Sequence, residues 1–187
     1  YEIRLSLVGS EMCIRDSPVG WHQTKEHAMT KALVAYFSAS HGKVTEAVAK
    51  KLAAATDADL FAIEPETHYS PADLNWSNAN SRSTKESNDP NSRPTLKNPV
   101  PDLSAYNTVY VGFPIWWYRE PRIIDTFLEA GHFAGKTIIP FATSSSSQMG
   151  NTSELMQKIV PAANVKQGAR FPASVTEEEL GNWAAQQ

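Results

Sequence analysis

Short apolar runs alternate along the chain with segments that have a helical stripe of apolar residues. The apolar runs predict β-strands at residues 31–37, 58–64, 107–113, 136–143 and 164–171. The helical stripes predict helices at residues 44–55, 121–130, 152–160 and 177–185. Because strands and helices alternate, the pattern indicates an α/β fold, with a five-stranded parallel sheet covered by helices on both faces.

One connection in this pattern is unusually long. Residues 65–106, which we call the insertion, lie between the second and third predicted strands and are rich in Asn, Ser, Asp and Pro. A crossover between parallel strands is usually a helix, and only residues 71–83 offer a weak helical pattern. A loop this long within a compact domain is usually functional or disordered. The insertion is therefore either a polar surface loop without a function of its own or a lid over a site.

Residues 1–28 show neither the helical spacing of apolar residues nor the alternating pattern of a strand. They lack the charged start, apolar core and cleavage pattern of a signal peptide, and the stretch SLVGSEMCIRDS resembles translated sequencing-adapter readthrough. Met29 is followed almost at once by the first predicted strand. We interpret residues 1–28 as non-native sequence or a disordered N-terminal extension, and residues 29–187 as one folded domain.

Composition and charge narrow the class of protein. The 187 residues are 41% hydrophobic and 20% charged, as in ordinary globular domains, and the formal net charge is −3. Because Lys and Arg form no cluster, nucleic acid and anionic membranes are poor partners, and no apolar run approaches the roughly 18 residues of a membrane span. Cys13 is the single cysteine, which excludes an internal disulfide, and the histidines lack metal-ligand spacing. These features predict a cytoplasmic protein without a bound metal.

Three loops follow the carboxyl ends of predicted strands, where open parallel sheets bind their ligands. The first, at residues 38–43, leads into a helix N-terminus, whose unpaired amides and positive dipole end favour an anion such as phosphate. The loop has no nucleophile with a paired base, so it predicts binding and no catalytic residue. The residues expected to contact the anion are Ser38, Ser40, His41, Gly42, Lys43, Val44 and Thr45. The alternative is a Ser-rich turn that merely caps the helix.

The second and third loops offer a flat surface and a hydrogen-bonding edge. In an extended segment neighbouring rings point opposite ways, so one aromatic ring enters the core while another stacks on a planar ligand. The expected contacts of the second loop are Pro114, Ile115, Trp116, Trp117 and Tyr118. Those of the third loop are Thr143, Ser144, Ser145, Ser146, Ser147 and Gly150. Core packing of the aromatic residues is the alternative. A phosphate, a planar ring and a polar edge together describe a mononucleotide such as FMN.

These motifs resemble the bacterial flavodoxin-like family, in the subgroup that has a PIWW loop. Matching stretches include VAYFSAS, ADLFAIEP, PDLSAYNTVYVGFPIWW and GKTIIPFATSSSSQMGNT, and the similarity covers residues 31–187. The resemblance implies a flavodoxin-like three-layer sandwich with strand order 2-1-3-4-5 and tightly but non-covalently bound FMN. Two features depart from the family pattern. The first loop is longer than Ser-x-Thr-Gly-x-Thr, which leaves open the hydroxyl that replaces the last Thr, and serines replace the usual Gly-Gly-Ser of the third loop.

Three other α/β folds fit the sequence less well. A dinucleotide fold would place Gly-x-Gly-x-x-Gly after the first strand, and this chain has no such motif. In a phosphate-binding loop of the Walker type, the first glycine would fall at Phe37 and a Ser or Thr at Val44. A receiver domain would have an Asp after the third strand, where this chain has Phe113 and Pro114.

The sequence leaves three functions open. The first, which we expect most, is a flavoprotein for electron transport that serves a redox partner protein. The second is an FMN-dependent NAD(P)H oxidoreductase acting on quinones or similar small acceptors, and the third is an interaction module without FMN. The mild net charge of −3 and Trp76 in the insertion, as part of a substrate pocket, favour the reductase. Both a monomer and a homodimer are compatible with the sequence.

Overall fold

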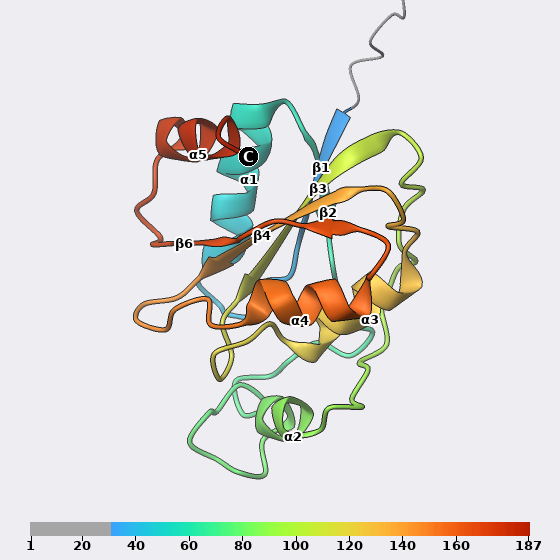
Figure 1. Cartoon of the computed structure of the whole chain (residues 1–187). Coiled ribbons are helices and arrows are strands. Elements are labelled where there is room, and N and C mark those ends of the chain that lie inside the picture. The colour runs from blue at the N-terminus through green and yellow to red at the C-terminus, as the bar shows by residue number, and fades with distance from the viewer. Residues whose placement is uncertain (1–30) are drawn as a thin grey trace, which may run out of the picture.

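The computed structural model describes residues 31–187, so the predictions for residues 1–28 lie outside the described residues. One parallel sheet runs through the described part of the chain (Figure 1). Its strands are β1 (Lys31–Tyr36), β2 (Asp59–Ala62), β3 (Tyr106–Pro114), β4 (Thr137–Thr143), β5 (Asn164–Val165) and β6 (Ala169–Phe171). The order β2-β1-β3-β4-β5, with β6 also paired to β4, confirms the strand order expected from the sequence.

Helices cover both faces of the sheet, which confirms the three-layer arrangement. They are α1 (Val44–Thr56), α2 (Arg82–Asn88), α3 (Arg122–Ala130), α4 (Thr152–Ile159) and α5 (Glu177–Ala184). Helices α1 and α5 pack on one face, and α3 and α4 pack on the other. Helix α2 belongs to the insertion and lies beyond α3 and α4, away from the sheet (Figure 1).

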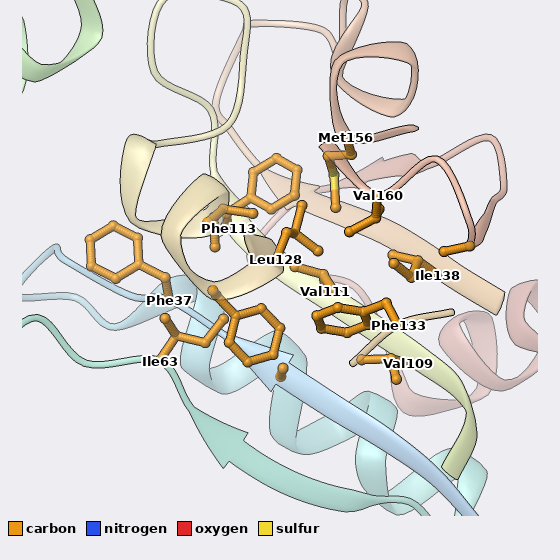
Figure 2. Packing of buried hydrophobic residues seen from close by; sticks show 14 of the residues in the cluster. Phe37, Ile63, Val109, Val111, Phe113, Leu128, Phe133, Ile138, Met156 and Val160 are labelled. Atoms are coloured by element: carbon orange, nitrogen blue, oxygen red, sulfur yellow. The ribbon is translucent and has the colours of Figure 1, made fainter. Parts of the chain in front are cut away.

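Alternation of side chains along the strands produces the two faces. In β1, Leu33 joins the cluster under α3 and α4, whereas its neighbour Val34 joins the cluster under α1 and α5. Figure 2 shows the first cluster, in which Phe113 of β3 lies near Leu128 of α3 and Met156 of α4. Each large apolar side chain buried in this way contributes about 1.5–3 kcal/mol. This packing fixes the edge of the sheet from which the three loops extend.

The last predicted strand, residues 164–171, is present in two pieces, β5 and β6, which both pair with β4. Pro140 of β4 explains the interruption. The Lys166 N–H donates to the Ile138 carbonyl at 2.8 Å, so Ile138 and, two residues on, Pro140 face this edge strand. Because Pro140 has no N–H, regular pairing stops there, and the edge strand bulges between β5 and β6.

The weak helical pattern at residues 71–83 forms turns up to Ser81, and α2 begins only at Arg82. Local hydrogen bonds give the reason. The Asn75 side-chain oxygen accepts from the Ser77 N–H at 3.1 Å, and bonds of this kind compete with a helix. Ser81 provides the start signal of α2, because its side chain accepts from a backbone N–H of the first turn.

Candidate cofactor site

A cavity of about 660 Å³ lies at the carboxyl ends of β1, β3 and β4, where the three predicted loops meet. Its volume is typical of small-molecule sites. The insertion supplies part of its wall. The lining residues are Ala39, Ser40, Leu74, Trp76, Ser83, Pro114, Ile115, Trp116, Trp117, Tyr118, Ser144, Ser145, Ser146 and Ser147. None of these residues is charged, so the cavity suits a neutral, largely planar group.

The cavity brings together residues of all three predicted loops, although some predicted residues lie outside its lining. The predicted residues that line it are Ser40, Trp76, Pro114, Ile115, Trp116, Trp117, Tyr118, Ser144, Ser145, Ser146 and Ser147. Those outside the lining are Ser38, His41, Gly42, Lys43, Val44, Thr45, Thr143 and Gly150. Sequence reasoning missed Ala39, Leu74 and Ser83. Ala39 lies between two predicted residues, but no sequence signal places Leu74 or Ser83 beside the loops.

The loop before α1 leaves backbone amides available for an anion. Lys43 precedes the helix in the left-handed region, at φ 45°, and no side chain within residues 31–187 caps this end. The first helical hydrogen bond runs from the Ala47 N–H to the Lys43 carbonyl at 2.9 Å, so the amides of residues 44–46 come before it. Uncapped amides at a helix N-terminus form a ready site for phosphate.

Ser38 adds a buried donor at the end of β1. Its Oγ is inaccessible and has no hydrogen-bond partner among the described residues. A buried hydroxyl without a partner costs about 1–3 kcal/mol, and a phosphate oxygen would remove that cost. The Lys43 ammonium is less available than the sequence indicates, because it pairs with Glu46 at 3.2 Å. Hydrogen bonds from Lys50 and then Lys43 lower the pKa of Glu46, so this carboxylate remains charged beside the loop.

Thr45 and Thr143, both expected to contact the cofactor, bond to each other in this structure. Their hydroxyl oxygens lie 2.8 Å apart in a buried contact between residues 98 positions apart in sequence. Each hydroxyl therefore has a protein partner, unlike that of Ser38. The bond joins the first loop to the third and holds together two sides of the candidate site.

The second loop contains a tight turn of residues 116–119, which we call the aromatic turn. The Trp116 N–H donates to the Arg119 carbonyl at 3.0 Å, and the Arg119 N–H donates back to Trp116 at 3.1 Å. Trp117 and Tyr118 occupy its two central positions with φ of 47° and 64°. Both residues are therefore in the left-handed region that two-residue hairpin turns require, and the loop is not extended as the sequence reasoning assumed.

The aromatic turn divides its rings between core and cavity. The Trp116 ring packs edge-on against Phe37 at 5.7 Å and Tyr69 at 5.4 Å between ring centroids. Trp117 is 40% exposed and Tyr118 is 70% exposed, and both line the cavity. The Trp116 ring also lines the cavity, so all three aromatic residues of the turn contribute to its wall.

The third loop packs directly against the aromatic turn. Gly150 has φ of 56°, and a Cβ atom there would lie 2.6 Å from the backbone oxygen of Tyr118. A side chain is excluded at this position by both conformation and space. Within the loop, the Ser144 Oγ accepts from the Ser147 N–H at 2.9 Å, while the Ser144 carbonyl accepts from Arg170 at 3.0 Å. The serine run is thus held in place and presents its hydroxyls along one wall.

The insertion is anchored to the sheet beside the cavity by Tyr69. Its ring packs against Phe37 at 5.8 Å, and the Arg82 guanidinium lies 4.1 Å above it. The Tyr69 hydroxyl donates to Glu86, and Arg82 pairs with the same carboxylate at 2.6 Å. Burial and the bond to Glu86 raise the pKa of Tyr69, so it stays a neutral donor. This anchoring brings Leu74, Trp76 and Ser83 to the cavity wall.

Comparison with known proteins places this architecture in a family. A family model described as flavodoxin matches residues 31–187, and the chain belongs to the flavodoxin family. Membership confirms the resemblance found in the sequence and supports FMN as the cofactor. None of the curated proteins compared with the chain matches it.

Solved structures agree with this family. A candidate flavoprotein of Bacteroides uniformis ATCC 8492 is 44% identical, with a TM-score of 0.77, and the match covers 83% of this chain and 97% of that protein. A candidate flavoprotein of Bacteroides eggerthii DSM 20697 is 42% identical, with a TM-score of 0.78 and coverage of 83% and 96%. A flavoprotein of Lactobacillus acidophilus NCFM, crystallised with FMN, is 20% identical, with a TM-score of 0.56 and coverage of 83% and 99%, and it supports the fold.

The residues of the site fit a flavin mononucleotide. The unpartnered Ser38 hydroxyl and the uncapped amides of α1 suit a phosphate, and the uncharged cavity beside them suits a tricyclic ring.

Among residues 31–187, no three His, Cys, Asp or Glu side chains gather as metal ligands would. No helix in the same range has the length and apolar character needed to cross a bilayer.

Proposed function

We propose that the protein binds FMN non-covalently and transfers electrons through it. The observation that carries this proposal is the buried Ser38 hydroxyl, which lacks a partner in the loop that leads from β1 to the uncapped N-terminus of α1, a loop that also lines the neutral aromatic cavity. When bound, FMN would supply the redox chemistry, and the protein would bind and orient it.

Each part of the site would have a separate task. The amides of residues 44–46 and the Ser38 hydroxyl would hold the phosphate. Trp117 or Tyr118 would stack on one face of the ring. The hydroxyls of residues 145–147 would face its polar edge, because the amides of Ser146 and Ser147 already donate to Ser144. Because Thr45 is bonded to Thr143, its backbone amide, rather than its hydroxyl, is the group that we assign to the phosphate.

The purified protein tests this proposal directly. It should be yellow, with flavin absorbance in roughly a one-to-one ratio to the chain, and acid should release FMN rather than FAD. Protein that is purified colourless should take up added FMN with quenching of flavin fluorescence. A protein that neither carries nor takes up FMN would overturn the proposal.

A reductase is the second candidate function, and the wall formed by the insertion favours it. Leu74, Trp76 and Ser83 extend the cavity beyond the three loops, which adds apolar surface where a second planar molecule could lie against the flavin. A carrier that serves a protein partner needs an accessible flavin edge instead. The exposed rings of Trp76 and Tyr118 stand at the rim and are compatible with both.

Anaerobic mixing with NADPH separates the two candidates. If the protein is a reductase, NADPH alone should bleach the flavin absorbance within minutes, and a quinone should restore it. If the protein is a carrier, NADPH alone should have no effect, whereas a catalytic amount of an NADPH-dependent flavoprotein reductase should bleach the bound FMN. Bleaching by neither route would contradict both candidate functions.

A further inference from the structure

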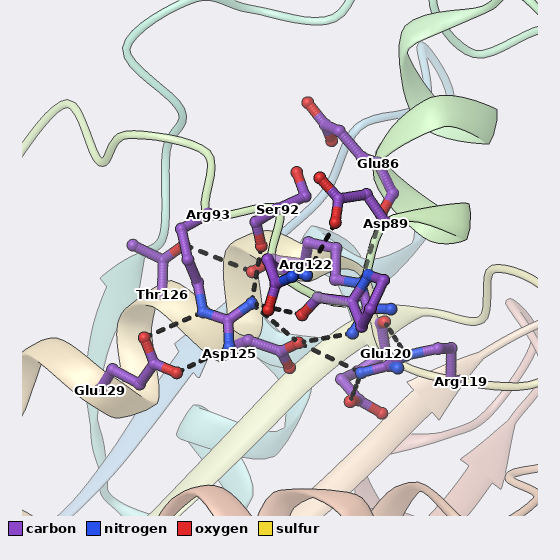
Figure 3. Close-up of polar contacts among 12 residues, drawn as sticks. Glu86, Asp89, Ser92, Arg93, Arg119, Glu120, Arg122, Asp125, Thr126 and Glu129 are labelled. Atoms are coloured by element: carbon purple, nitrogen blue, oxygen red, sulfur yellow. Dashed lines mark hydrogen bonds and ion pairs between the residues drawn. The ribbon is translucent and has the colours of Figure 1, made fainter.

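A network of charged side chains begins at Arg119, the last residue of the aromatic turn, and continues into α3 (Figure 3). It is built by the end of the turn, by α3 and by the chain that follows α2. Its members are Arg93, Arg119, Glu120, Arg122, Asp125 and Glu129. Neither the loop before α1 nor the cavity wall includes any of these residues, so the proposed FMN site does not explain them.

Two carboxyl groups at the centre of this network share one guanidinium nitrogen. Arg119 Nη2 lies 2.6 Å from Glu120 Oε1 and 3.1 Å from Asp125 Oδ2. Glu120 and Asp125 are each 1% exposed. A single nitrogen that bonds to both acids brings the two carboxyl groups together in a site that water does not reach.

The remaining charges around the pair are already engaged. Arg122 of α3 lies 3.1 Å from Asp125 Oδ2 and also donates to the carbonyls of Glu86 and Ser87 at the end of α2. Arg93 approaches Asp125 at 3.9 Å but forms its short contacts with Glu129, at 2.7 and 2.9 Å. The Glu86 side chain is turned toward Arg82 and Tyr69, away from the pair.

The second oxygen of each acid is buried without a partner. Glu120 Oε2 and Asp125 Oδ1 are inaccessible and accept no hydrogen bond from any described residue. Two buried carboxylates side by side would repel each other and leave both oxygens unsatisfied. A proton on one of the two groups removes the repulsion and lets that group donate a hydrogen bond.

We propose that Glu120 and Asp125 share one proton, and that this proton fixes Arg119 and thereby positions the aromatic turn beside the cofactor site. The role at the cofactor site rests on the proposed function, whereas the shared proton does not. Burial is the main factor that raises the pKa of Glu120 to about 7; Arg119 opposes this shift, and Asp125 adds to it. The proton is therefore lost near neutral pH.

Loss of the proton should move the turn rather than the helix. Asp125 lies in the buried first half of α3, whose neighbours Ile123 and Ile124 are fully packed. Glu120 lies between Arg119 and the residue that precedes the helix, and Trp117 and Tyr118 are exposed. Water can reach the deprotonated pair most easily by displacement of this short segment. The pair is thus a positioning device for the rings that face the cavity.

Carbon-13 NMR of the glutamate carboxyl groups in the flavin-free protein tests the shared proton. One glutamate signal should titrate near pH 7. The variant Glu120→Gln should lose that signal, because an amide copies the protonated acid without titrating. In Asp125→Asn the Glu120 signal should titrate at lower pH, because the neighbouring charge is gone. A Glu120 signal that titrates near 4.5, the ordinary glutamate value, in the native protein overturns the proposal, whether or not the variants fold.

Unfolding in urea provides a second readout, with a defined sign. Glu120 binds its proton more tightly in the folded protein, so the stabilisation is complete below the unfolded pKa and is lost as the pH rises through the folded pKa. From about pH 5 to pH 7 the unfolding constant should rise up to tenfold per pH unit. Glu120→Gln should abolish this slope. The control Glu129→Gln, which alters the same network, should retain it, because bonds from Arg93 lower the pKa of Glu129. An equal slope in the native protein and in Glu120→Gln contradicts the shared proton.

The indole signals of the flavin-free protein test the positioning role. The Trp117 signal should shift with the same pKa as Glu120 in the native protein and remain constant with pH in Glu120→Gln. Trp183, which packs on Phe171 of the opposite face, serves as the internal control. A Glu120 titration without a Trp117 shift would retain the shared proton and overturn the positioning role. None of these measurements uses flavin, so a protein that fails to bind FMN leaves them interpretable.

Discussion

The hydroxyl groups of Thr45 and Thr143 lie 2.8 Å apart and join the first turn of α1 to the end of β4. Both residues are buried, so neither hydroxyl has water as an alternative partner. Helix α1 and the serine loop therefore keep a fixed separation even without a ligand. The phosphate end and the polar edge of the candidate site are set by this contact.

Replacement of Thr45 by Val should lower the free energy of unfolding by about 1–3 kcal/mol, because it leaves the Thr143 hydroxyl buried without a partner. The double variant Thr45→Val, Thr143→Val should cost less than the sum of the two single changes. Urea unfolding of the flavin-free protein measures all three. Thr56→Val, which removes a hydroxyl that donates to a carbonyl of its own helix, is the matched control in α1. Additive costs would mean that the two hydroxyls do not interact.

Ser38→Ala should affect stability and binding in opposite ways. Without flavin the change removes a buried hydroxyl that has no partner, so stability should stay the same or rise slightly. With FMN the change removes a hydrogen bond to a charged oxygen, so affinity should fall by about 1.5–3 kcal/mol, or roughly 10- to 150-fold. Fluorescence titration with riboflavin, which lacks the phosphate, is the control and should give an unchanged affinity. Equal losses for both ligands would place the phosphate elsewhere.

The two tryptophans of the aromatic turn should have distinct effects. Trp116→Ala removes a ring packed on Phe37 and Tyr69 and should destabilise the protein by about 3 kcal/mol or more. Trp117→Ala should change stability little but weaken FMN and riboflavin by a similar factor, roughly three- to tenfold, because stacking involves the ring alone. Thermal unfolding and flavin titration separate the two effects. If Trp117→Ala leaves both affinities unchanged, Tyr118 becomes the stacking residue to test.

Trp76→Ala tests the reductase function at the rim of the cavity. Trp76 is 78% exposed, so its loss should leave stability and FMN content unchanged. If a planar acceptor binds against this ring, its KM should rise several-fold while kcat changes less. Leu60→Ala, which alters an exposed apolar residue of β2 outside the cavity lining, is the control. Unchanged kinetics in Trp76→Ala would exclude this ring from the acceptor site.

Local signals in the sequence predict most of the fold. The apolar runs gave every strand that lies in the interior of the sheet, and the helical stripes gave α1, α3, α4 and α5. The local pattern misleads at two places: the strand predicted at residues 164–171 is interrupted, and the weak helical pattern at residues 71–83 forms no helix there before Arg82. Pro140 interrupts a strand other than its own, and Asn75 satisfies a neighbouring amide that a helix would otherwise use.

The candidate site could be predicted only to the level of its loops. Because residues 38–43, 114–121 and 144–152 each follow a predicted parallel strand, the sequence predicts that they lie at one edge of the sheet. The sequence does not reveal which side chains are already satisfied by each other, so Thr45 and Ser38 looked alike although only Ser38 lacks a partner. The Glu120–Asp125 pair was missed for the same reason, since its burial depends on packing of α3 against the insertion.

The anchoring of the insertion determines how ligands reach the cavity. Tyr69 fixes its start, Arg122 holds the end of α2, and Arg93, a few residues after α2, binds Glu129. A segment held at three points offers no hinge, so entry does not wait for a backbone movement on the microsecond to millisecond timescale. Rotamer changes of the exposed Trp76 and Tyr118, which take picoseconds to nanoseconds, are enough to widen the opening. Ligand association should therefore be limited by diffusion, and ligand release by the contacts made inside the cavity.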